Sequence, residues 1–391
     1  MTDQLPDGVY LNLDEEVYFA QDALGSTDLV RLFQLKEGWW WQSRHNPDRQ
    51  PPDSKALTFG KALHAILLEG VAAYEARFVP YPDKPADAVD TIADMKAALR
   101  AAGFHLGSTS DWTRPDWAKA MRQNLPRRPC WFNILEDFYP NVGLRLVISL
   151  QEDRMLRLMR DIAVDPDRRD NAEVRTLFEA GSAFPPLSEV SILYTLPGGL
   201  RRRARIDRMF PKFDVDLKSL AGWTGRPLRY AVGDTIAKRG YDIQRADYWE
   251  ARRVAYRFIE AGQVYGGSPE ERSWLASFPQ QFPRWDWVWL FYQKPEPSGR
   301  APVIFPVWDD TYGAADSEGF GTIMSAGRAK CQAATLFYRK AVAQFGLQRP
   351  WARVEQVHYT DPDLDPAVII PHWIDDLEPN EDPDSPSDPA E

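Results

Sequence analysis

The segment FDVDLK, residues 213–218, follows the segment RRRARIDRMF, residues 201–210, after a connection of only two residues. Polar and apolar residues alternate through much of both segments, which is typical of β-strands, and a two-residue connection is the commonest one in a β-hairpin. The sequence therefore predicts an antiparallel hairpin whose innermost pair is Phe210 and Phe213. This hairpin decides the rest of the interpretation.

The register of the hairpin gathers charged residues. Counting from the turn places Asp207 opposite Asp216 and Arg205 opposite Lys218. Because successive side chains of a strand point to opposite faces, we expect Asp214, Asp216 and Lys218 to share a face with Asp207. The other face is predicted to be the core face, and it carries Ala204, Ile206, Phe210, Phe213, Val215 and Leu217.

A further strand, EVSILYT at residues 189–195, precedes the hairpin and is joined to it through Pro197-Gly198-Gly199. A three-residue loop there places Glu189 opposite Asp207, whereas a two-residue loop would pair Glu189 with Arg208 on the wrong face. The apolar residues Val190, Ile192 and Tyr194 favour the first register. We therefore expect Glu189, Asp207 and Asp216 side by side across three strands.

Carboxylates that face one another across strands repel, so three in a row need a cation between them. A hard divalent ion, Mg²⁺ or Mn²⁺, suits such a set of oxygen ligands. The alternative is a solvated polar face on which Arg203, Arg205 and Lys218 neutralise the acids.

The pattern of Asp207 followed by Asp216-Leu217-Lys218 resembles the signature of the PD-(D/E)XK nuclease superfamily. FGKALHAILLEG, residues 59–70, resembles the helix of RecB-like nucleases that carries a histidine near the metal, here His64. GYDIQRADYW, residues 240–249, resembles the QxxxY motif of that branch. GVYLNLDEEVYFAQDALGSTDLVRLF, residues 8–33, is similar to the phage and prophage group related to exodeoxyribonuclease VIII (the RecE-type group).

This resemblance implies that His64, Asp207, Asp216 and the carbonyl of Leu217 bind Mg²⁺ or Mn²⁺. Lys218 would orient or deprotonate the attacking water, or neutralise the developing charge. The other implied catalytic residues are Glu189, Gln244 and Tyr248. Without the resemblance, His64 is a structural histidine on a buried helix, and Gln244 and Tyr248, four residues apart, lie on one helix face that packs against the sheet.

Several arginines near these motifs are predicted to contact a phosphate backbone. Arg203 and Arg205 lie on the acid-bearing strand, and Arg245 and Arg252 lie on the predicted helix that carries Gln244. A solvated strand is the alternative for the first two.

The order of helical and strand segments predicts an α/β fold in which a central mixed sheet is flanked by helices. The resemblance implies the restriction-endonuclease-like core of the superfamily. We expect an N-terminal extension at residues 1–55, a nuclease domain at 56–373 and a disordered acidic tail at 374–391. The stretch 375–391 has eight acidic and no basic residues, so the remaining chain has a formal net charge of −2 out of −10. This balance does not exclude a nucleic-acid substrate.

Other classes of protein are excluded by composition. The two cysteines, Cys130 and Cys331, cannot form a four-cysteine zinc site or iron–sulfur cluster. The N-terminus does not resemble a signal peptide, and no run of 18 apolar residues occurs, so we expect a cytoplasmic protein without a membrane span.

Taken with the resemblance, these features imply a Mg²⁺-dependent exodeoxyribonuclease, encoded by a phage or prophage and acting in a bacterial host. It would degrade linear double-stranded DNA from 5′ ends, leave a 3′ strand for a single-strand annealing protein, and form a homo-oligomer. The alternatives are a DNA endonuclease of the same fold and a catalytically weak DNA-binding or interaction protein on a nuclease scaffold.

Overall fold

The structure is a computed structural model that describes residues 4–50, 55–105, 109–178, 187–220, 228–278, 286–293, 303–309 and 322–352. Its helices are α1 (Glu15–Ala20), α2 (Ser26–Leu35), α3 (Gly38–Gln42), α4 (Lys55–His64), the π-helical turn η1 (Ala65–Glu69), α5 (Val71–Arg77), α6 (Ile92–Ala101), α7 (Arg114–Asn124), α8 (Trp131–Val142), α9 (Leu150–Val164), α10 (Ala172–Thr176), α11 (Leu228–Arg239), α12 (Tyr241–Glu260), α13 (Pro269–Ala276) and α14 (Thr322–Phe345). Its strands are β1 (Gly8–Leu11), β2 (Phe78–Pro80), β3 (Leu146–Ile148), β4 (Leu187–Thr195), β5 (Arg201–Met209), β6 (Phe213–Ser219), β7 (Val264–Gly266), β8 (Asp286–Gln293) and β9 (Val303–Asp309).

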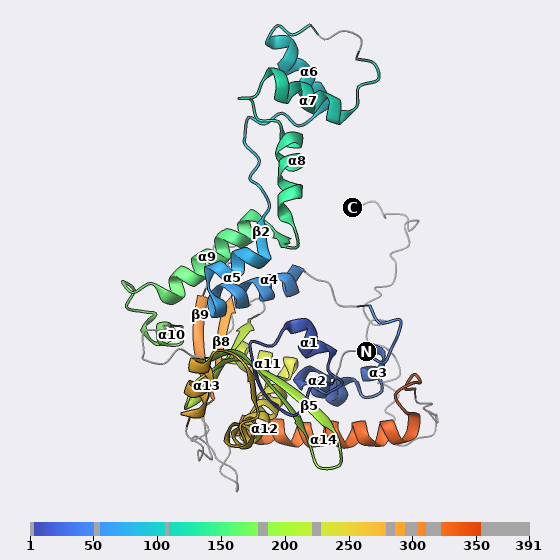
Figure 1. The fold of residues 1–391 in the computed structure, drawn as a ribbon, viewed down its shortest axis with the longest axis vertical. Helices are drawn as coiled ribbons and strands as arrows, with labels where there is room; N and C mark the ends of the chain where they lie inside the picture. Colours follow the sequence, from blue (N-terminus) through green and yellow to red (C-terminus); the bar gives the residue numbers. More distant parts are fainter. Residues whose placement is uncertain are drawn as a thin grey trace, which may run out of the picture.

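The centre of the fold is a mixed sheet of seven strands in the order β7-β1-β4-β5-β6-β8-β9 (Figure 1). Strands β4, β5 and β6 are antiparallel neighbours, and β8 pairs with β6 in parallel. Helices cover both faces of this sheet. The α/β architecture predicted from the sequence, with a central mixed sheet flanked by helices, is therefore confirmed.

Each face of the sheet has its own apolar core. On one face, α12 packs with Tyr248, Ala251 and Ala255 onto strand residues that include Ile206 and Trp289. On the other face, α4, η1 and α9 pack onto Val215, Leu217, Val288 and Leu290. Since both faces are covered, apolar side chains on β6 alternate with acidic side chains that are themselves buried.

The predicted register of β4 and β5 is confirmed, and so is that of β5 and β6 next to their turn. The predicted ladder pair of Asp207 and Asp216 is not formed, because the ladder ends at Arg208 and Val215. The amide of Phe210 donates to the carbonyl of Phe213 at 2.9 Å, as expected for the two-residue turn. Ladder pairs on either side of Glu189, Ser188 with Arg208 and Val190 with Ile206, place Glu189 opposite Asp207.

The predicted core face of the hairpin is wrong. Ala204 and Ile206 belong to the core beneath α12, whereas Phe210, Phe213, Val215 and Leu217 belong to the core beneath α4 and α9. The strict alternation of β5 fails after Asp207, because Asp207 contacts His64 of α4 and the next residue, Arg208, donates to the carbonyl of Phe178 on that same side. Asp214 and Asp216 therefore do not share a face with Asp207.

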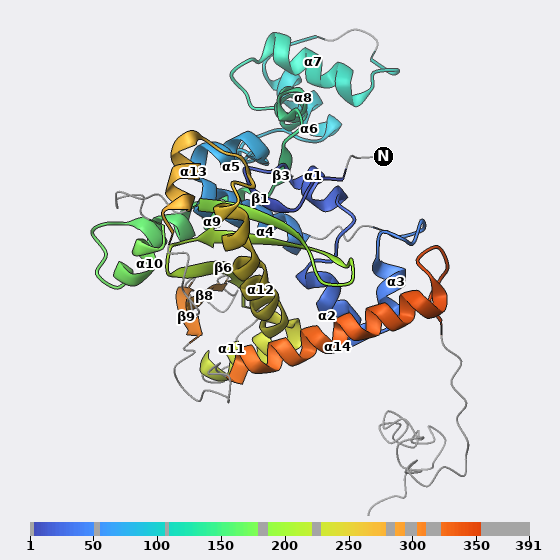
Figure 2. The same ribbon diagram turned by 60° about the horizontal axis from the view of Figure 1, so that its bottom comes forward.

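The N-terminal residues are part of the sheet domain and not an extension of it. Strand β1 lies between β7 and β4, and pairs with β4 antiparallel and with β7 parallel. Helices α2 and α3 pack with α14 around Trp39, Trp40 and Trp351 (Figure 2). The predicted boundary at residue 55 is corrected accordingly, and the predicted acidic tail at 374–391 lies outside the described residues.

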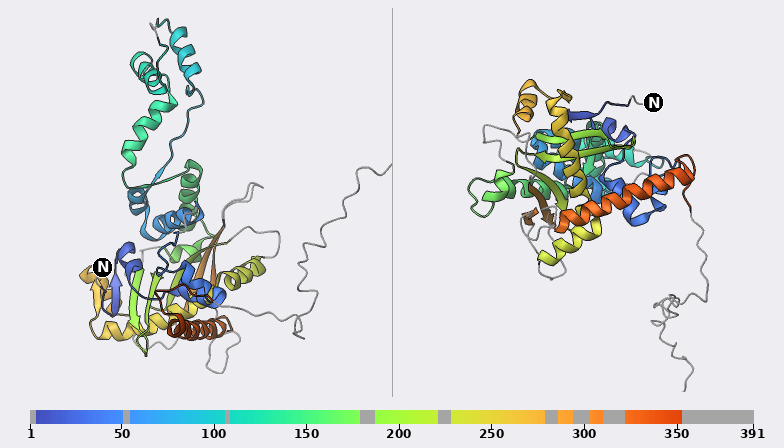
Figure 3. Two further views of the ribbon diagram at one scale, coloured as in Figure 1. Left: turned by 90° about the vertical axis from the view of Figure 1, so that its right-hand side faces the viewer. Right: turned by 90° about the horizontal axis from the view of Figure 1, so that it is seen from below.

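A helical lobe stands away from the sheet domain. Its helices α6, α7 and α8 enclose a separate core that includes Met95, Leu99, Trp117 and Met121, and the chain returns through the short parallel pair of β2 and β3 (Figures 1 and 3). Among the described residues, no helix combines the length and apolar character that a membrane span requires.

Candidate metal centre

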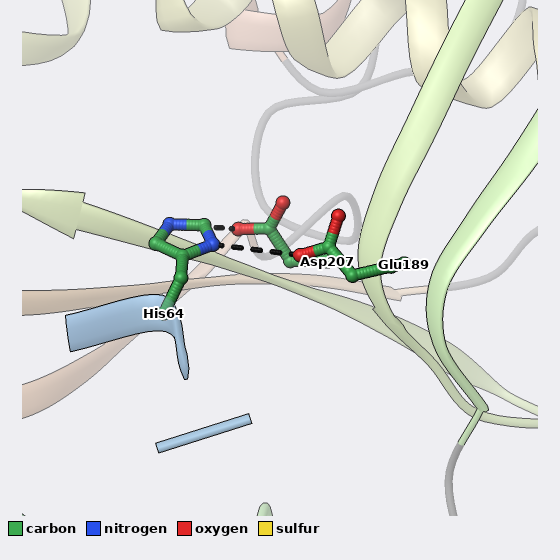
Figure 4. A group of neighbouring side chains, drawn as sticks. All are labelled: His64, Glu189 and Asp207. Atoms are coloured by element: carbon green, nitrogen blue, oxygen red, sulfur yellow. Dashed lines mark ion pairs between the residues drawn. The ribbon is translucent and has the colours of Figure 1, made fainter. Parts of the chain in front are cut away.

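Three side chains from three elements meet on the side of the sheet that α4 covers (Figure 4). His64 ends α4, and Glu189 and Asp207 come from the neighbouring strands β4 and β5. His64 Nδ1 lies 3.6 Å from Glu189 Oε1, and His64 Nε2 lies 3.6 Å from Asp207 Oδ2. One ligand atom from each residue lies within 4.8 Å of the other two. The three side chains are therefore close enough to be tested as a set of ligands for one cation.

The backbone around these residues is irregular. The α-helix changes to the π-helical turn η1 directly after His64, and such turns are frequent at functional sites. Glu189 adopts a left-handed conformation with φ of 54° inside a strand, which L-residues other than glycine rarely adopt. The π-turn and the left-handed residue both lie beside the side chains that form the cluster.

Asp207 also ends the ladder between β5 and β6. The ladder comprises Arg208 with Val215 and Met209 with Asp214. At the next step Asp207 Oδ2 accepts a hydrogen bond from the backbone N–H of Leu217 at 2.8 Å. A side chain thus takes the place of a backbone carbonyl, and the two strands separate beside the cluster.

Asp216 and Lys218 form a second group on the far side of this separation. Asp216 is fully buried, and its Oδ2 lies 2.6 Å from Lys218 Nζ. Gln244 of α12 donates to Asp216 Oδ1 at 3.0 Å. The Asp216 carboxylate therefore faces α12, and the His64 cluster consists of His64, Glu189 and Asp207.

The charges of the two groups are coupled. Burial lowers the pKa of His64, but the Asp207 carboxylate and a hydrogen bond with Glu189 outweigh it and raise that pKa to about 9. Burial raises the pKa of Asp216 to about 6 against the attraction of Lys218, and the negative charge of Asp207 adds to the increase. An imidazolium between two carboxylates supplies the positive charge that the acids require.

The His64 cluster and Lys218 line a single cleft with a volume of about 910 Å³, whereas Asp216 and Gln244 are not part of its lining. Its lining includes His64, Glu189, Asp207, Lys218 and Tyr248, so the structure brings these predicted site residues together. Tyr248 is nearly buried and packs edge-on against Trp287. Leu217 lines the cleft as well, and its backbone N–H is the group that contacts Asp207.

The predicted DNA-contacting arginines divide into two pairs. Arg203 and Arg205 line the cleft, where Arg205 donates to Ser191 and to the carbonyl of Leu13. Arg245 and Arg252 are only 1% exposed and form ion pairs with Asp309 and Asp214 inside the core. The prediction that these two contact a phosphate backbone is wrong, because each neutralises a buried carboxylate.

Sequence reasoning missed Tyr241, whose ring lies 5.1 Å from Lys218 Nζ and lines the cleft. The sequence did contain a signal for Tyr241, because Tyr241, Gln244 and Tyr248 are spaced three and four residues apart and so share one face of α12. It also missed Tyr18, a buried residue whose ring lies 4.2 Å from the guanidinium of Arg205. No local pattern pointed to Tyr18.

The donor set of the cluster fits a divalent cation. Mg²⁺ binds oxygen ligands at about 2.1 Å, so two of its ligands lie at most about 4.2 Å apart, and small rotations would bring this cluster to that size. The imidazole of His64 also suits transition metals such as Mn²⁺. Whether these residues bind a metal ion stays a prediction.

Comparison of the chain with models of protein families, with curated proteins and with solved structures finds no match.

Proposed function

We propose that this protein is a divalent-metal-dependent nuclease that hydrolyses phosphodiester bonds of DNA at the cleft lined by His64, Asp207 and Lys218. The observation that carries the proposal is the convergence of His64, Glu189 and Asp207 within 4.8 Å, beside a buried Asp216 that is paired with Lys218. Two carboxylates and an imidazole with an adjacent amine form a group that combines cation binding with proton transfer.

In this proposal His64, Glu189 and Asp207 hold the ion, and the buried Asp216 supports the site by holding Lys218, whose side chain lines the cleft. The ion would polarise the scissile phosphate and stabilise the negative charge of the transition state. Gln244 supports this arrangement, because its amide fixes one oxygen of Asp216 and leaves the other beside Lys218.

Lys218 is the proposed proton-handling and charge-neutralising group. Burial lowers the pKa of Lys218, but the carboxylates of Asp216 and Asp207 outweigh it and raise the pKa. The amine is therefore protonated in the ion-free state, and it acts by hydrogen bonding to the attacking water or to the phosphate. The ring of Tyr241 covers its other side.

The substrate is proposed to be linear double-stranded DNA, cut from a 5′ end so that a 3′ strand remains. This part of the proposal follows from the resemblance to the phage and prophage exonuclease group, as do the annealing partner and the homo-oligomer. Arg203 and Arg205 at the cleft are the side chains placed to attract a phosphate backbone.

The test compares a linear duplex with the same DNA as a closed circle, each with Mg²⁺, with Mn²⁺ and with EDTA. We expect release of nucleotides from the linear form only, and only with a divalent ion. Asp216→Asn, which disturbs a residue that supports the site, should reduce the rate about 10–100-fold, and Asp207→Asn, which removes a metal ligand, should reduce it by at least as much. Glu260→Gln, an exposed carboxylate at the end of α12, is the matched control.

The other outcomes separate the alternatives. Cutting of the closed circle would indicate an endonuclease. Binding of linear duplex without cleavage under every ion would indicate a DNA-binding protein on a nuclease scaffold. If Asp216→Asn cuts at the wild-type rate, the assignment of the site to this cleft is wrong.

A further inference from the structure

A second cavity, with a volume of about 340 Å³, lies between α12, α14 and the hairpin of β4 and β5. Helix α12 separates it from the candidate metal centre. With 3.6 residues per turn, Gln244 and Tyr248 share one side of α12, whereas Ala246 and Glu250, which line this cavity, lie on the other. The volume is near the lower end of the range of about 300–1,000 Å³ typical of small-ligand pockets.

The floor of this cavity is polar and buried. Arg202 forms an ion pair with Asp247 Oδ1, and the hydroxyl of Tyr194 donates to the same oxygen at 3.3 Å. All three side chains are at most 4% exposed. The other carboxylate oxygen, Asp247 Oδ2, is buried and has no hydrogen-bond partner within the described part of the chain. A buried acceptor left without a donor is costly, so a ligand that donates a hydrogen bond would stabilise Asp247 if the side chain turned this oxygen toward the cavity.

The walls and the rim define the rest of such a ligand. Trp249 offers a flat aromatic surface, and Leu196 and Leu336 add apolar side chains. The guanidinium of Arg328 lies 5.9 Å from the ring centroid of Trp249, and Arg339 stands at the edge, where it donates to the carbonyl of Pro197 at 2.7 Å. Aromatic and apolar walls favour a planar group, and two arginines favour an anion.

We propose that this cavity binds a nucleotide. The base enters between Trp249 and Leu336 and donates an N–H to Asp247 Oδ2, which the Asp247 side chain turns toward the cavity on binding, and the phosphate lies at Arg328 and Arg339. A free mononucleotide and a nucleotide within a single strand share this chemistry. The proposal stands independently of the nuclease activity, because none of its residues belongs to the metal centre.

The test measures by calorimetry the binding of AMP, GMP, CMP and a short single-stranded oligonucleotide to the full chain. The buffer contains EDTA, which suppresses metal-dependent binding at the candidate metal centre. We expect saturable binding that Leu336→Trp weakens at least about tenfold by filling the cavity. Leu158→Trp, at a comparably exposed leucine of α9, is the matched control and should leave binding unchanged. Arg339→Gln should weaken binding of the nucleotide about tenfold and should change binding of the matching nucleoside little, because the nucleoside has no phosphate.

Asp247→Asn tests the proposed hydrogen bond at the floor of the cavity, because it replaces the carboxylate acceptor by an amide. Asp247→Asn should weaken nucleotide binding while its circular dichroism spectrum stays that of the wild type. If Asp247→Asn does not fold, Leu336→Trp alone tests whether the nucleotide binds in this cavity. Saturable binding of mononucleotides would show that the ligand of this cavity is a free nucleotide. Binding of the oligonucleotide alone would show that the ligand is a nucleotide within a single strand. The proposal is overturned if neither binds, if Leu336→Trp binds like the wild type, or if ribose 5-phosphate binds as tightly as AMP.

Discussion

At the scale of single residues, Glu189 combines a strained backbone with a position in the candidate site. Its φ of 54° places it in the left-handed region, which costs an L-residue about 1–2 kcal/mol. The same residue points a carboxylate at His64 and at 3.9 Å from Arg205 Nε. Strain of this kind persists where the surrounding structure enforces it, and it is concentrated at functional sites.

Glu189→Gly should therefore stabilise the metal-free protein while it damages the site. Glycine accepts the left-handed conformation without strain, so we expect the free energy of unfolding to rise by up to about 1 kcal/mol. Calorimetric titration should show Mn²⁺ affinity reduced at least about tenfold. Glu189→Val is the counterpart, because a β-branched residue tolerates this conformation poorly and should lower the stability. Equal stabilities of the two variants in urea denaturation would contradict the strain argument.

Much of the residue-scale geometry was predictable, because turn lengths fix strand register. The loop Pro197–Gly199 and the two-residue turn before Phe213 were enough to place Glu189 opposite Asp207. The side of the sheet toward which the Asp216 side chain points was not predictable. The sheet is buried on both faces, so no solvent-exposed face indicates which direction a side chain takes, and the irregularity at Asp207 and Arg208 has no signal in the sequence.

At the scale of elements, α12 organises the fold through buried ion pairs. Asp242 pairs with Lys330 of α14, Arg245 with Asp309 of β9, Asp247 with Arg202 of β5, and Arg252 with Asp214 of β6. Removing one partner of such a pair leaves an uncompensated charge in the core, at a cost of about 3–5 kcal/mol.

Arg252→Met should lower stability in a pH-dependent way. Burial raises the pKa of Asp214 to about 6 although Arg252 lowers it, so the pKa rises further without Arg252. A carboxyl group with a raised folded-state pKa contributes stability at low pH, and this contribution is lost as the pH rises through that pKa. Urea denaturation should therefore show a loss of about 3–5 kcal/mol at pH 8 and a smaller loss near pH 5.

The neighbouring residue provides the control for this prediction. Arg253 is exposed and pairs with Glu250 on the same helix. Exposed pairs contribute little, so Arg253→Met should change the stability by less than about 1 kcal/mol at either pH. A pH-independent loss in Arg252→Met would show that Asp214 is not the group responsible.

The crossing of α12 and α14 depends on a glycine. A Cβ added at Gly327 of α14 would lie 2.1 Å from the carbonyl oxygen of Asp242, whereas a Cβ at Gly233 of α11 would meet nothing within 4 Å. Gly327→Ala should therefore destabilise the protein by at least about 1–3 kcal/mol through overpacking. Gly233→Ala should stabilise it by up to about 1 kcal/mol through helix propensity. Thermal unfolding of both variants checks the pair, and equal shifts would contradict the close packing of α12 and α14.

Long elements were the easiest to predict from the sequence. The helices now seen as α4 and α12 were both expected, at residues 59–70 and around Gln244. Helices α7 and α8 were missed. In α8, Trp131, Phe132 and Phe138 are only partly buried and Pro140 interrupts the helical pattern, so periodicity gives a weak signal there.

At the scale of the whole molecule, the helical lobe has its own core, and among the described residues it joins the sheet domain around β2 and β3. Replacing residues 84–143 by a flexible linker should leave the sheet domain folded, because its cores contain no residue of this segment. The measurement is near-ultraviolet circular dichroism with thermal unfolding of the shortened chain. Loss of cooperative unfolding would mean that the lobe is required for the fold.

The bond between the Asp207 carboxylate and the amide of Leu217 has a consequence for spectroscopy. An ion bound by that carboxylate would draw electron density from the oxygen that the amide contacts. The nitrogen-15 resonance of Leu217 is therefore an internal probe of occupancy, readable in the intact protein without DNA. Its displacement on titration with Mg²⁺, and its insensitivity in Asp207→Asn, would identify the occupied state directly.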